Sequence, residues 1–224
     1  MIKQTLLSST MLAIMMIIFY SAAGRTNIPR SWYFFAVAFI YFLSSNIVLY
    51  KYNPNLLIQR LIIRRKGSKK WDEVLVRVSN LTALLLMPLI TGLDVGRYGW
   101  SNLGQFYAFL GYVSLVVSSV LINWAMVVNP FFEPTVRIQE EREHKVVSSG
   151  PYAFVRHPGY LSGILWVGSI PLILGSLYGF FPFLLYSVFM ILRTYLEDET
   201  LLEELSEYRE YAEKVRYRLF PGLW

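Results

Sequence analysis

Long apolar runs separated by short polar segments dominate the chain, and their lengths are the first guide to its architecture. The first run, Thr5–Ala23, carries no charge and is long enough to cross about 30 Å of hydrocarbon as a helix rising about 1.5 Å per residue. Runs of similar length follow at Trp32–Tyr50, Val74–Leu93 and Leu103–Val128. The first run could instead be a cleaved signal peptide, because Ser21–Ala23 resembles a cleavage site, but we favour a retained span.

Two shorter apolar runs follow, at Tyr160–Leu174 and Phe180–Leu192. The stretch between them, GSLYGFFP, has the glycine and proline content of a tight helical hairpin. With about 15 residues, the first of these runs reaches only about 22 Å, which is short of the hydrocarbon thickness. We therefore expect the loop before it to lie below the membrane interface, where protein covers it or where it lines a wet cavity.

Beyond the last run, apolar residues recur at steps of three and four, which predicts an amphipathic helix with one apolar seam. The seam consists of Leu201, Leu205, Tyr208, Ala212, Val215 and Leu219. Acidic residues at the start of this helix and basic residues at its end suit the helix dipole, and they are also typical of a solvated face.

The distribution of basic residues predicts the orientation. Lys51–Glu73 holds seven lysines and arginines, whereas Gly24–Ser31 holds two and Asp94–Asn102 holds one. Lys51–Glu73 is therefore expected in the cytoplasm, and six spans place both termini and the 129–158 segment on the same side. The expected fold class is all-α: a polytopic membrane helical bundle with about six transmembrane helices and a cytosolic C-terminal amphipathic helix.

Composition agrees with lipid as the main solvent. Of the 224 residues, 55% are hydrophobic and 17% are aromatic, which is more apolar surface than a soluble domain of this length can bury. The net charge of +6 could indicate nucleic acid, but the basic residues lie mainly between apolar runs, so we expect membrane lipids and no nucleic acid as partners. The absence of cysteine excludes disulfides and thiolate chemistry, and two histidines exclude a multi-histidine metal site.

Candidate chemistry first appears in GPYAFVRHPGYLSG, residues 150–163. Proline pushes the preceding residue away from helical geometry, so Pro151 and Pro158 predict a shaped loop beside Arg156 and His157. The alternative is an interfacial connector whose basic residues meet anionic lipid. The shaped loop is favoured because an interfacial connector does not explain the placement of the prolines.

A second candidate cluster lies in RTYLEDE, where the last apolar run ends. Glu197 lies one helical turn after Arg193, at the membrane boundary. The two could form a simple ion pair worth a few tenths of a kcal/mol. Charges so close to lipid are costly without a partner or a use, however, which favours a functional site.

These motifs resemble those of the isoprenylcysteine carboxyl methyltransferase and phospholipid methyltransferase family of integral membrane enzymes. The resemblance covers about Asn129–Pro221 and rests on GPYAFVRHPGYLSG, RTYLED and YREYAEKVRYRLFP. It implies a methyltransferase that uses S-adenosyl-L-methionine and acts on a lipid-like acceptor, either an isoprenylcysteine-type carboxylate or a phospholipid amine. We expect residues 1–128 to form a four-span region that selects substrate, and residues 129–224 to form the catalytic region.

The resemblance also implies individual roles by motif match. It implies cofactor-binding roles for His144, Gly150, Pro151, Tyr152, Arg156, His157, Pro158, Tyr160, Gly163, Glu197 and Asp198. It implies catalytic roles for Arg193, which would position the acceptor, and for Glu197. The second acid is Asp198 where the family has glutamate, so Asp198 and Glu199 both remain candidates for that position.

Two other functions stay open. The carboxyl-terminal stretch YRLFPGLW also resembles the ends of membrane sterol reductases, which use a reduced nicotinamide. A non-enzymatic membrane scaffold is the second alternative. The intact Arg-His-Pro loop and the acidic helix favour the methyltransferase, while the acceptor (carboxylate, amine or thiol) and the oligomeric state stay open.

Overall fold

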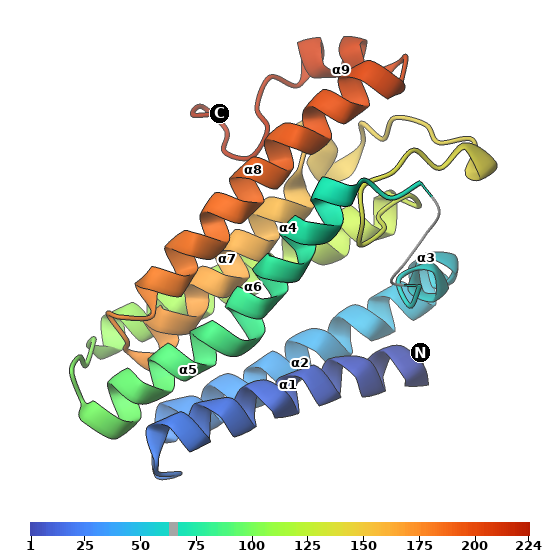
Figure 1. Cartoon of the computed structure of the whole chain (residues 1–224). Coiled ribbons are helices and arrows are strands. Elements are labelled where there is room, and N and C mark those ends of the chain that lie inside the picture. The colour runs from blue at the N-terminus through green and yellow to red at the C-terminus, as the bar shows by residue number, and fades with distance from the viewer. Residues whose placement is uncertain (63–66) are drawn as a thin grey trace.

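The computed structural model describes residues 1–62 and 67–224, and these residues form helices joined by loops, without a strand (Figure 1). The α-helices are α1 Ile2–Ala23, α2 Pro29–Tyr52, α3 Pro54–Gln59, α4 Lys70–Leu81, α5 Met87–Gly92, α6 Gln105–Val128, α7 Pro158–Leu174, α8 Phe180–Glu204 and α9 Tyr208–Lys214. Two π-helical segments, η1 Thr82–Leu86 and η2 Leu93–Tyr98, and two 3-10 turns, η3 Glu140–Arg142 and η4 Gly150–Ala153, complete the described elements.

The predicted fold class, an all-α polytopic membrane bundle, is confirmed. Within the described residues, five helices are long and apolar enough to cross a membrane: α1, α2, the continuous stretch Lys70–Tyr98, α6 and α8. The sixth apolar helix, α7, has 17 residues and is shorter, as its sequence predicted. The protein is therefore an integral membrane protein.

The stretch Lys70–Tyr98 is one helix with two π-helical segments. Proline at position 88 cannot donate a backbone hydrogen bond and clashes with the preceding turn, and the wider π turn before it accommodates that clash. Glycines at 92 and 96 face α1, where an added Cβ would collide with Phe19 or Ala23. These small residues allow the close approach that membrane helices use for packing.

Helix α7 is the central helix of the bundle. Its residues Val167, Ile170 and Ile173 are almost fully buried. Two serines join it to α6, because each hydroxyl, of Ser118 and of Ser162, donates to the other residue's carbonyl at 2.9 Å. The position of α7 fixes where the loop before it emerges.

The two ends of the bundle differ in content (Figure 1). The amino terminus, α3, the connector 129–157 and α9 lie toward one end, and the loops 24–28 and 175–179 lie toward the other. This arrangement agrees with an even number of passes through the bilayer. Of the basic residues behind the predicted orientation, Arg64, Arg65 and Lys66 lie outside the described residues.

The buried carboxylate of Asp94 connects several segments at the end of the bundle that holds the loops 24–28 and 175–179. It accepts hydrogen bonds from the Ser101 backbone N–H at 2.9 Å, from the Ser176 hydroxyl at 2.6 Å and from the Tyr178 backbone N–H at 3.3 Å. The Ser101 hydroxyl also donates to it. Asp94 thereby ties η2 to the loop before α6 and to the α7–α8 hairpin.

The C-terminal segment differs from the single amphipathic helix predicted for it. Helix α8 continues to Glu204, the chain becomes extended at Leu205 (φ −120°, ψ 102°), and only Tyr208–Lys214 is helical beyond that point. The seam still faces inward, with Tyr208 and Leu219 buried. The break has a physical reason: it turns α9 back over the loop before α7, where Tyr208 finds a buried hydrogen-bond partner.

Replacing Asp94 with alanine should destabilise the fold. The substitution leaves two backbone N–H groups and two hydroxyls without their acceptor, and unsatisfied buried donors cost about 1–3 kcal/mol. Chemical denaturation in detergent would measure this loss. Glu213→Ala, at an exposed acid on α9, is the control, and equal stability of the two variants would contradict the role given to Asp94.

Candidate functional site

The connector 129–157 folds back over the start of α7. Asn129 donates from its side-chain nitrogen to the Tyr152 hydroxyl at 2.9 Å and accepts from the Phe131 backbone N–H at 2.8 Å. The ring of Phe132 lies directly against Gly159, where an added Cβ would collide with it. The first part of the connector therefore packs against Tyr152 of the loop and against the first turn of α7.

The loop itself is shaped as its prolines predicted. Gly150 adopts a positive φ of 61°, and an added Cβ there would meet the Trp124 ring nitrogen at 2.8 Å. Further along, the backbone N–H groups of Arg156 and His157 donate to the carbonyls of Tyr217 and Arg218, each at 2.9 Å. The loop is thus held between α6 on one side and the C-terminal tail on the other.

Asp198 lies at the centre of the site and has no exposed surface. One of its oxygens accepts from the Tyr208 hydroxyl at 2.7 Å and lies 3.2 Å from His157 Nε2. The other lies 2.8 Å from Arg218 Nε and 3.1 Å from Arg156 Nη2. Four side chains from three segments therefore converge on one carboxylate.

Glu197 lies beside this network on the same turn of α8. The Tyr160 hydroxyl donates to its carboxylate, and His157 Nδ1 lies 3.9 Å from the same oxygen. The rings of His157 and Tyr160 are stacked, with centroids 5.7 Å apart and planes 5° from parallel. The imidazole thus lies between the two acids, and the side chain of Glu197 keeps 23% of its surface exposed.

Arg193 joins the site through Tyr160, because its guanidinium lies 4.8 Å from the centre of that ring. Its main partner is Asp72 of α4, with Nε 2.5 Å from one carboxylate oxygen and Nη2 3.2 Å from the other. Nη2 also donates to the carbonyl of Pro134 at 2.6 Å. Arg193 is therefore paired to another helix rather than to Glu197.

Asp72 is a residue that the sequence prediction missed. It is fully buried, and it also accepts from the Val136 backbone N–H at 2.7 Å. A signal was present, because an acid near the membrane boundary is costly without a partner, the same argument that singled out Glu197. The sequence alone does not show that the partner of Asp72 is Arg193, because the two residues are 121 positions apart.

Of the two tyrosines of α9, Tyr208 was predicted as a residue of the apolar seam, and Tyr211 was given no individual role. Burial, followed by the charge of Asp198, raises the pKa of the Tyr208 hydroxyl, so this group acts as a hydrogen-bond donor at neutral pH. The Tyr211 hydroxyl donates to the Tyr152 carbonyl at 2.7 Å. Both residues fasten α9 over the site.

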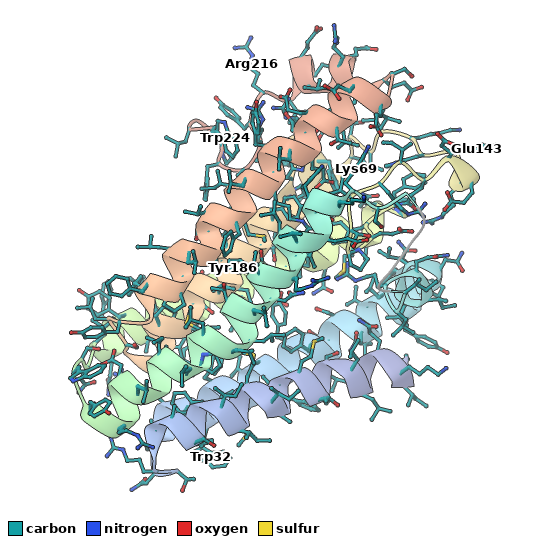
Figure 2. The ribbon with its side chains drawn as sticks, in the orientation of Figure 1. Trp32, Lys69, Glu143, Tyr186, Arg216 and Trp224 are labelled. Atoms are coloured by element: carbon teal, nitrogen blue, oxygen red, sulfur yellow. The ribbon has the colours of Figure 1, made fainter. Side chains whose placement is uncertain are left out.

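The tail after α9 adds Arg218, which the sequence prediction also missed. Its guanidinium lies 5.9 Å from the Tyr195 ring and 5.2 Å from the Trp224 ring. Figure 2 shows Trp224 alongside α8. These two rings hold Arg218 in place against Asp198.

The structure brings most, but not all, of the predicted residues together. Arg156, His157, Tyr160, Glu197 and Asp198 form one connected cluster. Gly163 lies further along α7, where an added Cβ would be 2.8 Å from the Tyr186 hydroxyl; Figure 2 places Tyr186 on α8. Pro151 and Tyr152 are buried in the supporting loop, and Pro158 begins α7.

His144 lies on the connector, with its ring centroid 4.5 Å from that of Phe131. The Gln139 backbone N–H donates to its Nδ1 at 3.5 Å. Burial, followed by the charge of Arg137, lowers the pKa of His144, which favours the neutral ring at pH 7. Within the described residues its hydrogen bond and ring contact are not with the Asp198 cluster, and its predicted cofactor role stays a prediction.

The two candidates for the second acid occupy different environments. Asp198 is inside the cluster, whereas the Glu199 side chain is 43% exposed and lies 3.8 Å from Arg218. Geometry therefore favours Asp198 as the acid of the site.

Fold and site together define a polytopic membrane protein with a buried polar cluster at one end of its helical bundle. Residues 109–203 match the model of the isoprenylcysteine carboxyl methyltransferase (ICMT) family. The chain is 26% identical over 187 residues to a probable protein-S-isoprenylcysteine O-methyltransferase of Oryza sativa subsp. indica, covering 81% of this chain and 91% of that relative. It is 30% identical over 126 residues to the protein-S-isoprenylcysteine O-methyltransferase of Saccharomyces cerevisiae, covering 54% of this chain and 52% of that relative.

Residues 109–203 are therefore similar to the isoprenylcysteine carboxyl methyltransferase family, as the motifs indicated, and this similarity supports a membrane methyltransferase. The family segment contains the loop 150–163 and the start of the acidic cluster, including Arg193, Glu197 and Asp198. It does not contain Asp72, Tyr208 or Arg218.

Replacing Asp198 with alanine should cost much more stability than replacing Glu199. Asp198→Ala leaves buried cations without their anion, which costs about 3–5 kcal/mol, whereas Glu199→Ala removes an exposed pair worth about 0–1 kcal/mol. The free energy of unfolding in detergent would measure both. A larger loss in Glu199→Ala would reverse the assignment of the two acids.

Proposed function

We propose that this protein is an S-adenosyl-L-methionine-dependent methyltransferase that esterifies the carboxylate of a lipid-like, isoprenylcysteine-type acceptor. The observation that carries the proposal is the buried cluster of Arg156, His157, Tyr160, Glu197 and Asp198 within the family segment. The printed names of the relatives, which are S-isoprenylcysteine O-methyltransferases, support the acceptor class.

The donor set of the cluster fits the charged groups of this cofactor. Arg156 Nε is a buried N–H that has no hydrogen-bond partner among the described residues, and it suits a carboxylate. The partly exposed carboxylate of Glu197 suits an amino group. Asp198 is already in polar contact with four side chains, so its part in the proposal is to hold Arg156 and His157 in position.

When bound, S-adenosyl-L-methionine supplies a methyl group on sulfonium; the acceptor oxygen forms the new C–O bond while the C–S electron pair returns to sulfur. A carboxylate acceptor is already ionised at neutral pH, so no residue of the chain has to remove a proton. The protein contributes orientation and exclusion of water. Arg193, held by Asp72 and lying over Tyr160, is placed to orient the acceptor.

A phospholipid amine is the less favoured acceptor. An amine requires a base, and Glu197 is the nearest candidate in the cluster. Its carboxylate oxygen already accepts the Tyr160 hydroxyl and is therefore occupied. The arrangement therefore suits a carboxylate better than an amine.

The proposal also places the site at the cytoplasmic face, as the basic residues between α2 and α4 predict. Residues 1–128 would select the acceptor and residues 129–224 would hold the cofactor. This division is functional rather than structural, because Asp72 from the first region forms the buried pair with Arg193 of the second.

Arg156→Ala should weaken cofactor binding by about 10- to 100-fold, since hydrogen bonds to charged groups contribute about 1.5–3 kcal/mol. Isothermal titration calorimetry in detergent would measure the affinity. The control is Arg209→Ala, at an exposed arginine of α9. Unchanged affinity in Arg156→Ala would reject its assigned role.

The reaction itself can be assigned from the stability of its product. The purified protein should transfer a labelled methyl group to an N-acylated, S-prenylated cysteine, and mild base should release the label as methanol, because an ester hydrolyses and a methylamine does not. Label that resists base, or that appears only in phospholipid, would contradict the proposed carboxylate acceptor.

A further inference from the structure

We propose that Arg60 binds the anionic group of the methyl acceptor, so that Arg60 rather than Arg193 supplies the uncompensated positive charge of the acceptor site. This inference rests on the proposed methylation of a carboxylate. It adds a specificity-determining residue from outside the segment that matches the family.

The first step is that Asp72 already neutralises Arg193. Two nitrogens of the Arg193 guanidinium face the two carboxylate oxygens at 2.5 and 3.2 Å, and the Pro134 carbonyl takes a further bond at 2.6 Å. Both charged groups are buried. A paired arginine of this kind can still orient an acceptor through a free N–H, but its net attraction for an anion is small.

The second step is that Arg60 has no carboxylate partner among the residues that the structure describes. It follows α3, and its Nη1 donates to the Phe132 carbonyl at 3.2 Å while its guanidinium lies 5.4 Å from the Phe132 ring. Within residues 1–62 and 67–224, no carboxylate lies within 4.0 Å of it. Arg60 is a half-buried cation held by a carbonyl and a ring.

The third step places Arg60 beside the site. The Phe132 ring contacts Gly159. The next residue is Tyr160, and the Arg193 guanidinium lies 4.8 Å from the centre of the Tyr160 ring. Arg60 and Arg193 therefore both lie near the first turn of α7. Burial lowers the pKa of Arg60 to about 10, and the positive charge of Arg193 contributes in the same direction. Arg60 remains protonated at pH 7.

These steps together predict the chemistry of the ligand. A cation removed from water without a counter-ion is destabilised, and an anionic group that reaches it restores the balance. Arginine also presents a planar fork that matches a carboxylate with two parallel hydrogen bonds. Arg60 should therefore distinguish an acidic acceptor from the same molecule with a neutral head.

The test compares two ligands that differ only in charge: an N-acylated, S-prenylated cysteine and its carboxamide. Wild-type protein should bind the acid about tenfold or more tightly than the amide, and Arg60→Gln should abolish that preference while cofactor affinity stays unchanged. Arg60→Lys, which keeps the charge but loses the fork, should retain part of the preference and provides a second variant if Arg60→Gln does not fold.

The matched control is Arg30→Gln. Arg30 lies at the other end of α2, and its Nη1 also donates to a backbone carbonyl, that of Leu103 at 2.6 Å. It should leave the acid-to-amide preference intact. An unchanged preference in Arg60→Gln, or equal binding of acid and amide by the wild type, would overturn the role of Arg60.

The two proposals fail in different ways. If the wild-type protein forms no base-labile methyl ester, the proposed function fails whatever Arg60 does. If the wild type forms the ester and Arg60→Gln keeps the full preference for the acid, only the assignment of Arg60 fails.

Discussion

A buried carboxylate is stable only when donors or cations surround it, and the contacts of Asp198 hold together the end of the bundle that contains the candidate site. Arg156 and His157 come from the loop before α7, Tyr208 comes from α9, and Arg218 comes from the tail. Removal of any one would leave charge or polarity uncompensated in a region of low dielectric. The break after α8 and the irregular tail become understandable as the chain path that delivers these donors to one point.

The pair of Asp72 and Arg193 extends the same principle to the early spans. It joins α4 to α8 across 121 positions, and it links the region expected to select the acceptor to the region expected to hold the cofactor. Charges at a membrane boundary are retained when they are paired or used. Here the ion pair with Asp72 holds Arg193 in place. The half-buried Arg60 has no carboxylate partner among the described residues. In the proposal, Arg193 therefore orients the acceptor, and Arg60 binds its negative charge.

Much of this could be predicted from the sequence. Apolar run lengths gave the helices, and the length of α7 indicated a covered loop, because both depend on local patterns that lipid enforces. Pro151 and Pro158 indicated a shaped loop for the same local reason. The contributions of Asp72 and Tyr208 could not be predicted, because they depend on contacts between distant segments. The helix break at Leu205 was missed because the seam periodicity continues across it.

The central claim is that the loop 150–160, the acidic turn of α8 and the tail around Tyr208 and Arg218 form a single cofactor chamber. Hydrogen–deuterium exchange with and without S-adenosyl-L-homocysteine, the demethylated cofactor, tests it most directly. The account predicts that ligand protects all three segments together, with the loops 24–28 and 175–179 unchanged. Protection of only one segment, or of none, would contradict it.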